Sequence, residues 1–268
     1  FRRVLFRSLL TRALACGALL SLAACVGADA PVGPTPGSPS FDGDAALELV
    51  SRQVAFGPRV PGTAGHGAQL AWMMARLDSL DAAVSADTFS HVSAAGDSLT
   101  LVNVLARFRP EAARRIVLLA HWDTRPRSDQ AADSSEHAIP VPGANDGASG
   151  TAVLLALAPL LAASPPPMGV DLLFVDGEDF GPGVEDMLLG ARRYASTLPE
   201  TGRPVYGLLL DMVGDATPRF PVEGYSAQYA NAVVRKVWRA AERLGFAEFF
   251  PSGVETSITD DHIPLNQA

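Results

Sequence analysis

The chain has 268 residues, of which 48% are hydrophobic and 19% are charged, so its composition excludes a disordered polypeptide and allows one large or two small folded domains. Its formal net charge is −8, and Lys236 is its single lysine. A surface that binds nucleic acid needs clustered lysine and arginine side chains, so we expect no nucleic-acid partner.

The N-terminal segment has the pattern of an export signal. Several arginines up to Arg12 precede a short apolar run at 13–22, which leads to the sequence Leu-Ala-Ala-Cys ending at Cys25. This run is too short to span a bilayer comfortably, so we predict a signal peptide over residues 1–25.

The end of this segment resembles the bacterial lipobox, which implies that Cys25 is the lipidated first residue of the mature protein. The protein would then be an exported lipoprotein on the periplasmic or cell-surface side, held to the membrane only through Cys25. The alternative is a plain signal peptide with an incidental cysteine. Cys16 and Cys25 are both in this segment, so no disulfide is expected in the mature domain.

The rest of the chain is predicted to consist of a tether and one catalytic domain. Residues 26–43 are rich in Pro, Gly and Ser and lack an apolar period, which indicates a tether. Residues 44–268 are expected to fold. The apolar spacing predicts a helix at 65–83, strands at 86–93 and 99–108, buried strands at 116–120, 170–175 and 206–210, and helices at 148–163, 186–197 and 227–244.

The alternation of buried strands with helices predicts the fold class. Short, continuous apolar runs are typical of strands that are buried on both faces of a sheet. We therefore expect an α/β fold, a three-layer sandwich with a central mixed, largely parallel sheet flanked by helices.

Titratable side chains follow each of the three buried apolar runs. His121 follows the first run, Glu178 and Asp179 follow the second, and Asp211 follows the third. A single Asp at such a position often caps the next helix. Because ligands of open α/β sheets bind outside the carboxyl ends of the strands, three such ends favour one shared site.

A glycine-rich turn supplies a further carboxylate. The sequence Gly-Ala-Asn-Asp-Gly places Asp146 just before the predicted 148–163 helix, where it is either a helix cap or a metal ligand. The preceding residues 124–145 are long and irregular, which is typical of a binding loop.

Five ordered motifs resemble the zinc exopeptidase superfamily, which contains aminopeptidases and the animal-type and bacterial glutaminyl-peptide cyclotransferases. The resemblance covers about residues 45–268 and also includes the sequence Phe-Gly-Pro-Arg-Val-Pro-Gly that begins at Phe56. The motifs are His-Trp-Asp-Thr from His121, Gly-Ala-Asn-Asp-Gly-Ala-Ser-Gly from Gly143, Asp-Gly-Glu-Asp from Asp176, Leu-Leu-Asp-Met-Val-Gly from Leu209 and Thr-Asp-Asp-His-Ile-Pro from Thr259.

The resemblance implies a zinc enzyme in which Asp146 and Asp179 bind the metal and Glu178 is the general acid/base. Most relatives have Glu where this chain has Asp179, and both are oxygen donors. His121 and Asp211 match positions that bind a second zinc in the aminopeptidases and that form hydrogen bonds in the cyclases. The last His ligand of the family lies in a motif beyond Asp-His-Ile-Pro, so the catalytic domain is expected to be incomplete at its C-terminus.

Asp260 separates the two candidate reactions. Cyclases have Asp-Asp-His-Ile-Pro at this place, as here, whereas aminopeptidases have Ser-Asp-His. The resemblance therefore implies a zinc-dependent glutaminyl-peptide cyclotransferase that acts on peptide or protein N-termini, with Glu178, Asp211 and Asp260 as its catalytic carboxylates. The alternatives are a zinc aminopeptidase and, because the metal carboxylates are present, less readily a non-catalytic binding module.

Overall fold

The computed structural model describes residues 40–268. The predicted signal peptide, the predicted lipid anchor at Cys25 and all but the last residues of the predicted tether lie outside the described residues. None of the described helices has the length and apolar character needed to cross a membrane.

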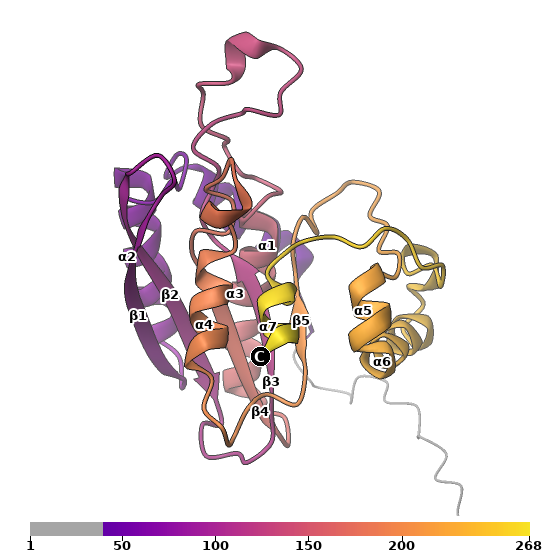
Figure 1. Ribbon diagram of the computed structural model, residues 1–268. Helices are drawn as coiled ribbons and strands as arrows, with labels where there is room; N and C mark the ends of the chain where they lie inside the picture. The colour runs from indigo at the N-terminus through magenta and orange to yellow at the C-terminus, as the bar shows by residue number, and fades with distance from the viewer. Residues whose placement is uncertain (1–39) are drawn as a thin grey trace, which may run out of the picture. The chain divides into compact units, whose positions relative to one another are not determined.

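Five strands form one mixed sheet in the order β1-β2-β4-β3-β5 (Figure 1). The neighbouring pairs β4–β3 and β3–β5 are parallel, and the pairs β1–β2 and β2–β4 are antiparallel. The short 93–97 connection allows β1 and β2 only an antiparallel pairing, whereas helix α3 provides the crossover between parallel β3 and β4. The strands are β1 Ala83–Val92, β2 Ser98–Phe108, β3 Arg115–His121, β4 Gly169–Val175 and β5 Gly207–Leu209.

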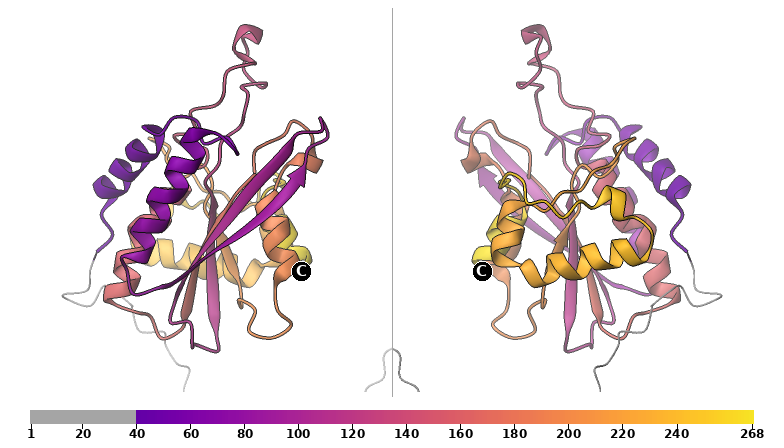
Figure 2. Two further views of the ribbon diagram at one scale, coloured as in Figure 1. Left: turned by 90° about the vertical axis from the view of Figure 1, so that its left-hand side faces the viewer. Right: turned by 90° about the vertical axis from the view of Figure 1, so that its right-hand side faces the viewer.

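Helices cover both faces of the sheet, which confirms the predicted layered α/β fold. Helices α1, α2 and α3 lie on one face and α4 and α7 lie on the other, as the side views show, and α5 and α6 lie beyond the β5 edge (Figures 1 and 2). The helices are α1 Gly43–Val54, α2 Ala64–Asp78, α3 Ala148–Ala163, α4 Leu189–Thr197, α5 Gly224–Tyr229, α6 Asn231–Arg243 and α7 His262–Gln267, with single 3-10 turns η1 Ser134–Glu136, η2 Val184–Asp186 and η3 Ala247–Phe249.

Several elements differ from the sequence prediction. The single helix predicted at 227–244 is two helices, α5 and α6, because the backbone of Ala230 leaves the helical region with φ −130° and ψ 28°. Helix α1 was not predicted; its N-cap Asp42 accepts a hydrogen bond from the backbone N–H of Ala45 at 3.0 Å. Helix α7 was not predicted either.

The core holds the carboxyl ends of the parallel strands in place. Strand β4 is buried along its whole length. Each fully buried large apolar side chain contributes about 1.5 to 3 kcal/mol to folding, so this strand is a firm support for the residues that follow it. Side chains packed between the sheet and the α1–α3 layer include Met73, Leu77, Val104, Phe108, Trp122, Leu154, Leu155 and Phe174.

Candidate active site

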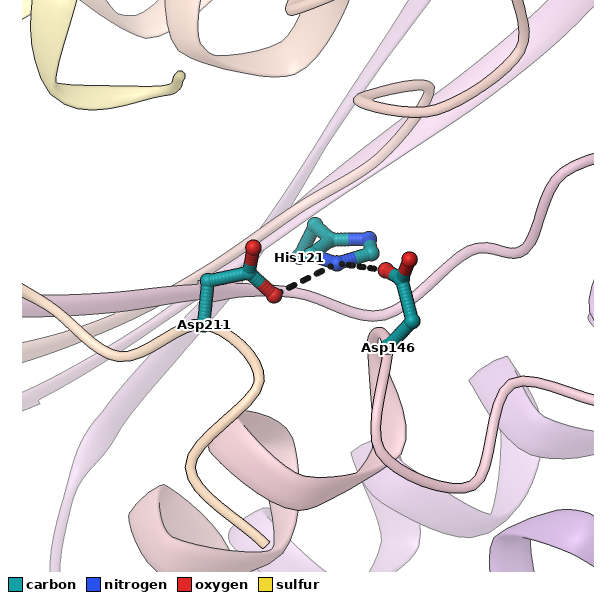
Figure 3. A group of neighbouring side chains, drawn as sticks. All are labelled: His121, Asp146 and Asp211. Carbon is teal, nitrogen blue, oxygen red and sulfur yellow. Dashed lines mark hydrogen bonds and ion pairs between the residues drawn. The ribbon is translucent and has the colours of Figure 1, made fainter. Parts of the chain in front are cut away.

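His121 is the last residue of β3 and lies between two carboxylates (Figure 3). Its Nε2 atom is 3.0 Å from Oδ1 of Asp146 and 3.2 Å from Oδ1 of Asp211. One ligand atom from each of the three residues lies within 4.8 Å of the others. An imidazole nitrogen and carboxylate oxygens are donors that zinc accepts in proteins, so this group fits a zinc ion.

Arg59, whose side chain is fully buried, holds the turn that carries Asp146. The guanidinium donates to the backbone carbonyls of Pro142 and Gly143, both at 2.6 Å. Helix α3 has Gly147 as its N-cap, with no side-chain cap. Asp146 is therefore not a helix cap, and its carboxylate is available to His121.

The loop after β5 is tied to the same turn. The backbone N–H of Gly214 donates to Oδ1 of Asn145 at 2.8 Å, and that of Val213 donates to the hydroxyl of Ser149 at 3.0 Å. These two hydrogen bonds join the segment that carries Asp211 to the segment that carries Asp146. Two parts of the chain that are far apart in sequence thus present their carboxylates to one imidazole.

Glu178 and Asp179 follow β4 and are held by the carboxylate of Asp123. The backbone N–H of Glu178 donates to Oδ1 of Asp123 at 3.1 Å, and that of Asp179 donates to Oδ2 at 3.3 Å. Asp123 is itself fully buried. It connects the end of β3 with the end of β4, and Oδ1 lies 3.5 Å from Nδ1 of His121.

Burial and crowding of like charges raise the pKa values of the carboxyl groups at this site. Burial raises the pKa of Glu178 well above its usual value, and the nearby charges of Asp261, Asp123 and Asp260 add to the shift. Burial, followed by the charge of Asp211, raises the pKa of Asp260 to about 6. Carboxyl groups with such pKa values can hold and release a proton near neutral pH.

Asp179 is also buried near other carboxylates, but the positive charge of Arg125 lies beside it. Burial and the charge of Asp146 raise the pKa of Asp179 to about 6, although Arg125 acts in the opposite direction. The carboxyl groups of Asp146 and Asp179 are therefore near enough for the charge of one to act on the other. The assignment of Asp146 and Asp179 as the zinc ligands stays a prediction, because the group whose ligand atoms lie within 4.8 Å of one another contains His121 and Asp211 beside Asp146 and does not contain Asp179.

His121 is buried among these carboxylates. Burial alone lowers the pKa of its ring, but hydrogen bonds to Asp123, Asp146 and Asp211 raise that pKa well above the usual value. A histidine that binds a metal has to be neutral, so metal binding to this ring requires loss of its proton.

Sequence reasoning gave no role to Arg59, Asp123, Arg125 and Asp261. Asp261 is fully buried, and neither of its carboxylate oxygens has a hydrogen-bond partner among the described residues. Burial raises its pKa well above the usual value, with the charge of Asp260 as the next cause. Arg59, Asp123 and Asp261 belong to the quoted motifs and Arg125 directly follows one of them, but the contacts of these residues could not be read from the motifs.

The chain is similar to a known protein family and to solved structures of bacterial glutaminyl cyclases. A family model described as Peptidase family M28 matches residues 103–268. The crystal structure of Bacteroides thetaiotaomicron glutaminyl cyclase is 37% identical, with a TM-score of 0.83, over 86% of this chain and 82% of that chain. The crystal structure of Porphyromonas gingivalis glutaminyl cyclase is 40% identical, with a TM-score of 0.81, over 85% of this chain and 80% of that chain.

A curated relative extends the comparison to animals. The glutaminyl-peptide cyclotransferase of Drosophila melanogaster is 30% identical over 236 residues, which is 78% of this chain. The chain spans 64% of that protein, less than two thirds of its length. With the matched region covering more than half of its residues, the chain belongs to peptidase family M28.

Proposed function

We propose that the chain is a zinc-dependent glutaminyl-peptide cyclotransferase, which converts the N-terminal Gln of peptides or proteins to pyroglutamate and releases ammonia. The observation that carries this proposal is that the charge of Asp260 acts on Glu178 and the charge of Asp211 acts on Asp260, at a position where aminopeptidases have Ser. The similarity to solved glutaminyl cyclases supports the same reaction.

In this proposal, Asp146 and Asp179 hold the zinc ion. The metal, when bound, supplies a Lewis acid for the γ-carboxamide of the substrate Gln. His121 and Asp211 provide hydrogen bonds beside it. The buried Asp123 keeps the backbone of Glu178 and Asp179 in place, so that one side chain can bind metal while the other remains free for proton transfer.

Glu178 moves the proton in this reaction. The α-amine of the substrate attacks the carbonyl carbon of the γ-carboxamide (Cδ of Gln), a bond forms between nitrogen and that carbon, and Glu178 accepts the proton that the amine loses. Glu178 then gives a proton to the leaving nitrogen as the bond between carbon and that nitrogen breaks, and ammonia leaves. A carboxyl group whose pKa is raised by burial suits both halves of this exchange.

Asp260 holds a proton more readily than an ordinary aspartate in this proposal. Burial and the charge of Asp211 raise the pKa of Asp260 to about 6, because like charges that lie close together cannot all ionise. A carboxyl group that holds a proton is a poor metal ligand, so Asp260 disfavours a second zinc, and Asp211 is left to form hydrogen bonds.

A zinc aminopeptidase is the second candidate. One observation favours it: the ligand atoms of His121, Asp146 and Asp211 are close enough to bind a metal of their own. An aminopeptidase uses two zinc ions to activate water, and this group would supply the second site. The acidic Asp260 beside Asp211 disfavours this alternative.

The two reactions separate in a direct assay. The purified protein would be incubated with a Gln-peptide and with a Leu-anilide, and its zinc content would be measured in parallel. The proposal expects ammonia release from the Gln-peptide, little release of Leu and one zinc ion per chain. Efficient Leu-anilide hydrolysis together with two tightly bound zinc ions would establish the aminopeptidase instead.

We also propose that the protein is an exported lipoprotein anchored through Cys25. The basic flank, the short apolar run and the Leu-Ala-Ala-Cys sequence support this proposal. Peptide N-termini outside the cytoplasm would then be its substrates.

A further inference from the structure

Arg125 lies at the base of the 126–141 loop, the segment that projects beyond the sheet between β3 and α3 (Figures 1 and 2). The backbone N–H of Val141 donates to the carbonyl of Arg125 at 3.0 Å and closes the loop. The residue is only 7% exposed, so its guanidinium is held inside the protein. Arginine at this depth requires acceptors for its N–H groups.

The guanidinium of Arg125 joins two carboxylates from different segments. Nε and Nη2 donate to the two oxygens of Asp129 in the loop, at 2.6 and 3.1 Å. Nη1 donates to Oδ1 of Asp179 at 2.5 Å. The two parallel hydrogen bonds to Asp129 fix the orientation of the guanidinium as well as neutralising its charge, because the planar group fits a carboxylate in one orientation.

The backbone beside Asp179 is shaped for this guanidinium. Gly181 has a positive φ of 53°, and a Cβ atom at this position would lie 2.9 Å from Nη1 and 3.0 Å from Nη2 of Arg125. Only glycine therefore leaves room for the guanidinium to lie against this turn. This fit is independent of the two ion pairs and indicates a fixed place for the side chain.

These contacts leave one oxygen of Asp179 free. Oδ1 is bound to Arg125, whereas Oδ2 has no hydrogen-bond partner among residues 40–268. The backbone N–H of Asp179 is fixed separately by Asp123. Both the main chain and one carboxylate oxygen of Asp179 are thus held, which restricts the orientations open to the remaining oxygen.

We propose that Arg125 is a positioning residue that presents Oδ2 of Asp179 to zinc and ties the 126–141 loop to that ligand. The inference rests on the proposed function, because it takes Asp179 as a zinc ligand. It adds that order in the loop and affinity for zinc are coupled through one side chain. Loss of a residue that forms a hydrogen bond to a metal ligand and so orients it weakens metal binding by about 10- to 100-fold.

The test compares four variants of the full chain: Arg125→Met, Arg125→Lys, Asp129→Asn and Arg193→Met. The last removes another arginine–aspartate pair, with Asp87, that is half exposed. Zinc affinity is measured by chelator competition, and amide hydrogen exchange is followed over 126–141 in metal-free protein. Arg125→Met should weaken zinc binding by about 10-fold or more and speed loop exchange, while Arg193→Met should change neither.

The other variants separate the two halves of the contact. Asp129→Asn should speed loop exchange and leave zinc affinity within about threefold, because Asp179 keeps its partner. Arg125→Lys should recover part of the zinc affinity and leave the loop fast, since an ammonium cannot bridge both carboxylates. If Arg125→Met does not fold, these two variants decide, and unchanged loop exchange in both would overturn the inference.

An additional variant distinguishes this inference from the proposed function. If Asp179→Ala leaves zinc affinity unchanged, the ligand assignment in the proposed function is wrong, and the positioning role falls with it. If Asp179→Ala weakens zinc binding while folded Arg125→Met binds zinc as the parent does, only the role of Arg125 is wrong. Neither measurement depends on catalytic turnover.

Discussion

Gly150 in the first turn of α3 lies against the backbone carbonyl of Leu210, the residue before Asp211. A Cβ atom at Gly150 would collide with that carbonyl oxygen. The close approach allows the Asp211 segment to lie beside the Asp146 turn, so a glycine with no chemistry of its own determines the spacing of two candidate site carboxylates.

Gly150→Ala should destabilise the protein by about 1 to 3 kcal/mol, because the added methyl group displaces backbone that cannot move freely. Urea denaturation measures the change. Gly67→Ala is the matched control: Gly67 is an exposed position of helix α2 with no heavy atom within 4 Å of its added Cβ, and the substitution should stabilise the protein by about 0.5 to 1 kcal/mol. Equal effects of the two substitutions would contradict the argument.

Glu178→Gln should reduce cyclisation by about a hundredfold or more, because the amide keeps the shape of the side chain but cannot accept a proton. Its zinc content should equal that of the parent protein. Asp146→Ala should lose zinc, which provides the comparison. The roles are misassigned if Glu178→Gln loses zinc and its remaining zinc-bound fraction turns over normally.

Asp260→Ser should weaken cyclisation by about tenfold or more and raise the zinc content toward two ions per chain. Burial and the charge of Asp211 raise the pKa of Asp260 to about 6, so the substitution removes a carboxyl group that can hold a proton near neutral pH beside Asp211. Elemental analysis and ammonia release report the two effects. Unchanged turnover with a single zinc ion would remove Asp260 from the mechanism.

The buried carboxyl group of Asp176 should make the free energy of unfolding depend on pH at acidic pH. Its Oδ2 accepts a hydrogen bond from the backbone N–H of Val102 at 2.7 Å and lies 2.9 Å from Nε2 of His66. Burial raises the pKa of this carboxyl group to about 6, despite the opposing effect of His66. The folded state therefore binds more protons than the unfolded state between about pH 4 and pH 6, and stability from this group falls as the pH rises through that range.

Asp176→Asn cannot titrate and isolates this effect. The free energy of unfolding of the parent minus that of the variant should fall by on the order of 2 to 3 kcal/mol from pH 4 to pH 6 and then level off. Urea denaturation at a series of pH values measures the difference. A difference that rises with pH over this range would show that the carboxyl group is stabilised in its charged form.

Cys25→Ser should release the protein from membranes or block processing of its N-terminal segment, because the thiol is the predicted site of lipidation. Cell fractionation followed by detection of the protein measures the distribution. Ser38→Ala in the predicted tether serves as a control and should not alter it. Identical membrane fractions for the parent and Cys25→Ser would leave Cys25 without a role as an anchor.

The sequence by itself determined the strands β3 and β4 and the acidic residues that follow them, whereas the third strand predicted as buried, β5, is a partly exposed strand at the edge of the sheet. Apolar runs such as 116–120 and 170–175 are local signals, and a strand buried on both faces has few other compositions available. The shared edge followed from the rule that parallel strands place their carboxyl ends together. The structure accordingly brings His121, Asp146 and Asp211 within reach of one another.

Only the tertiary structure decided which groups face one another within that edge. The pair Arg125–Asp179 and the clamp of Asp123 on Glu178 each join residues more than 50 positions apart, and no local pattern encodes such contacts. The break at Ala230 likewise has no apolar spacing that marks it. Local sequence sets burial and backbone preference, whereas the direction of a polar side chain depends on which oppositely charged group the folded chain packs against it.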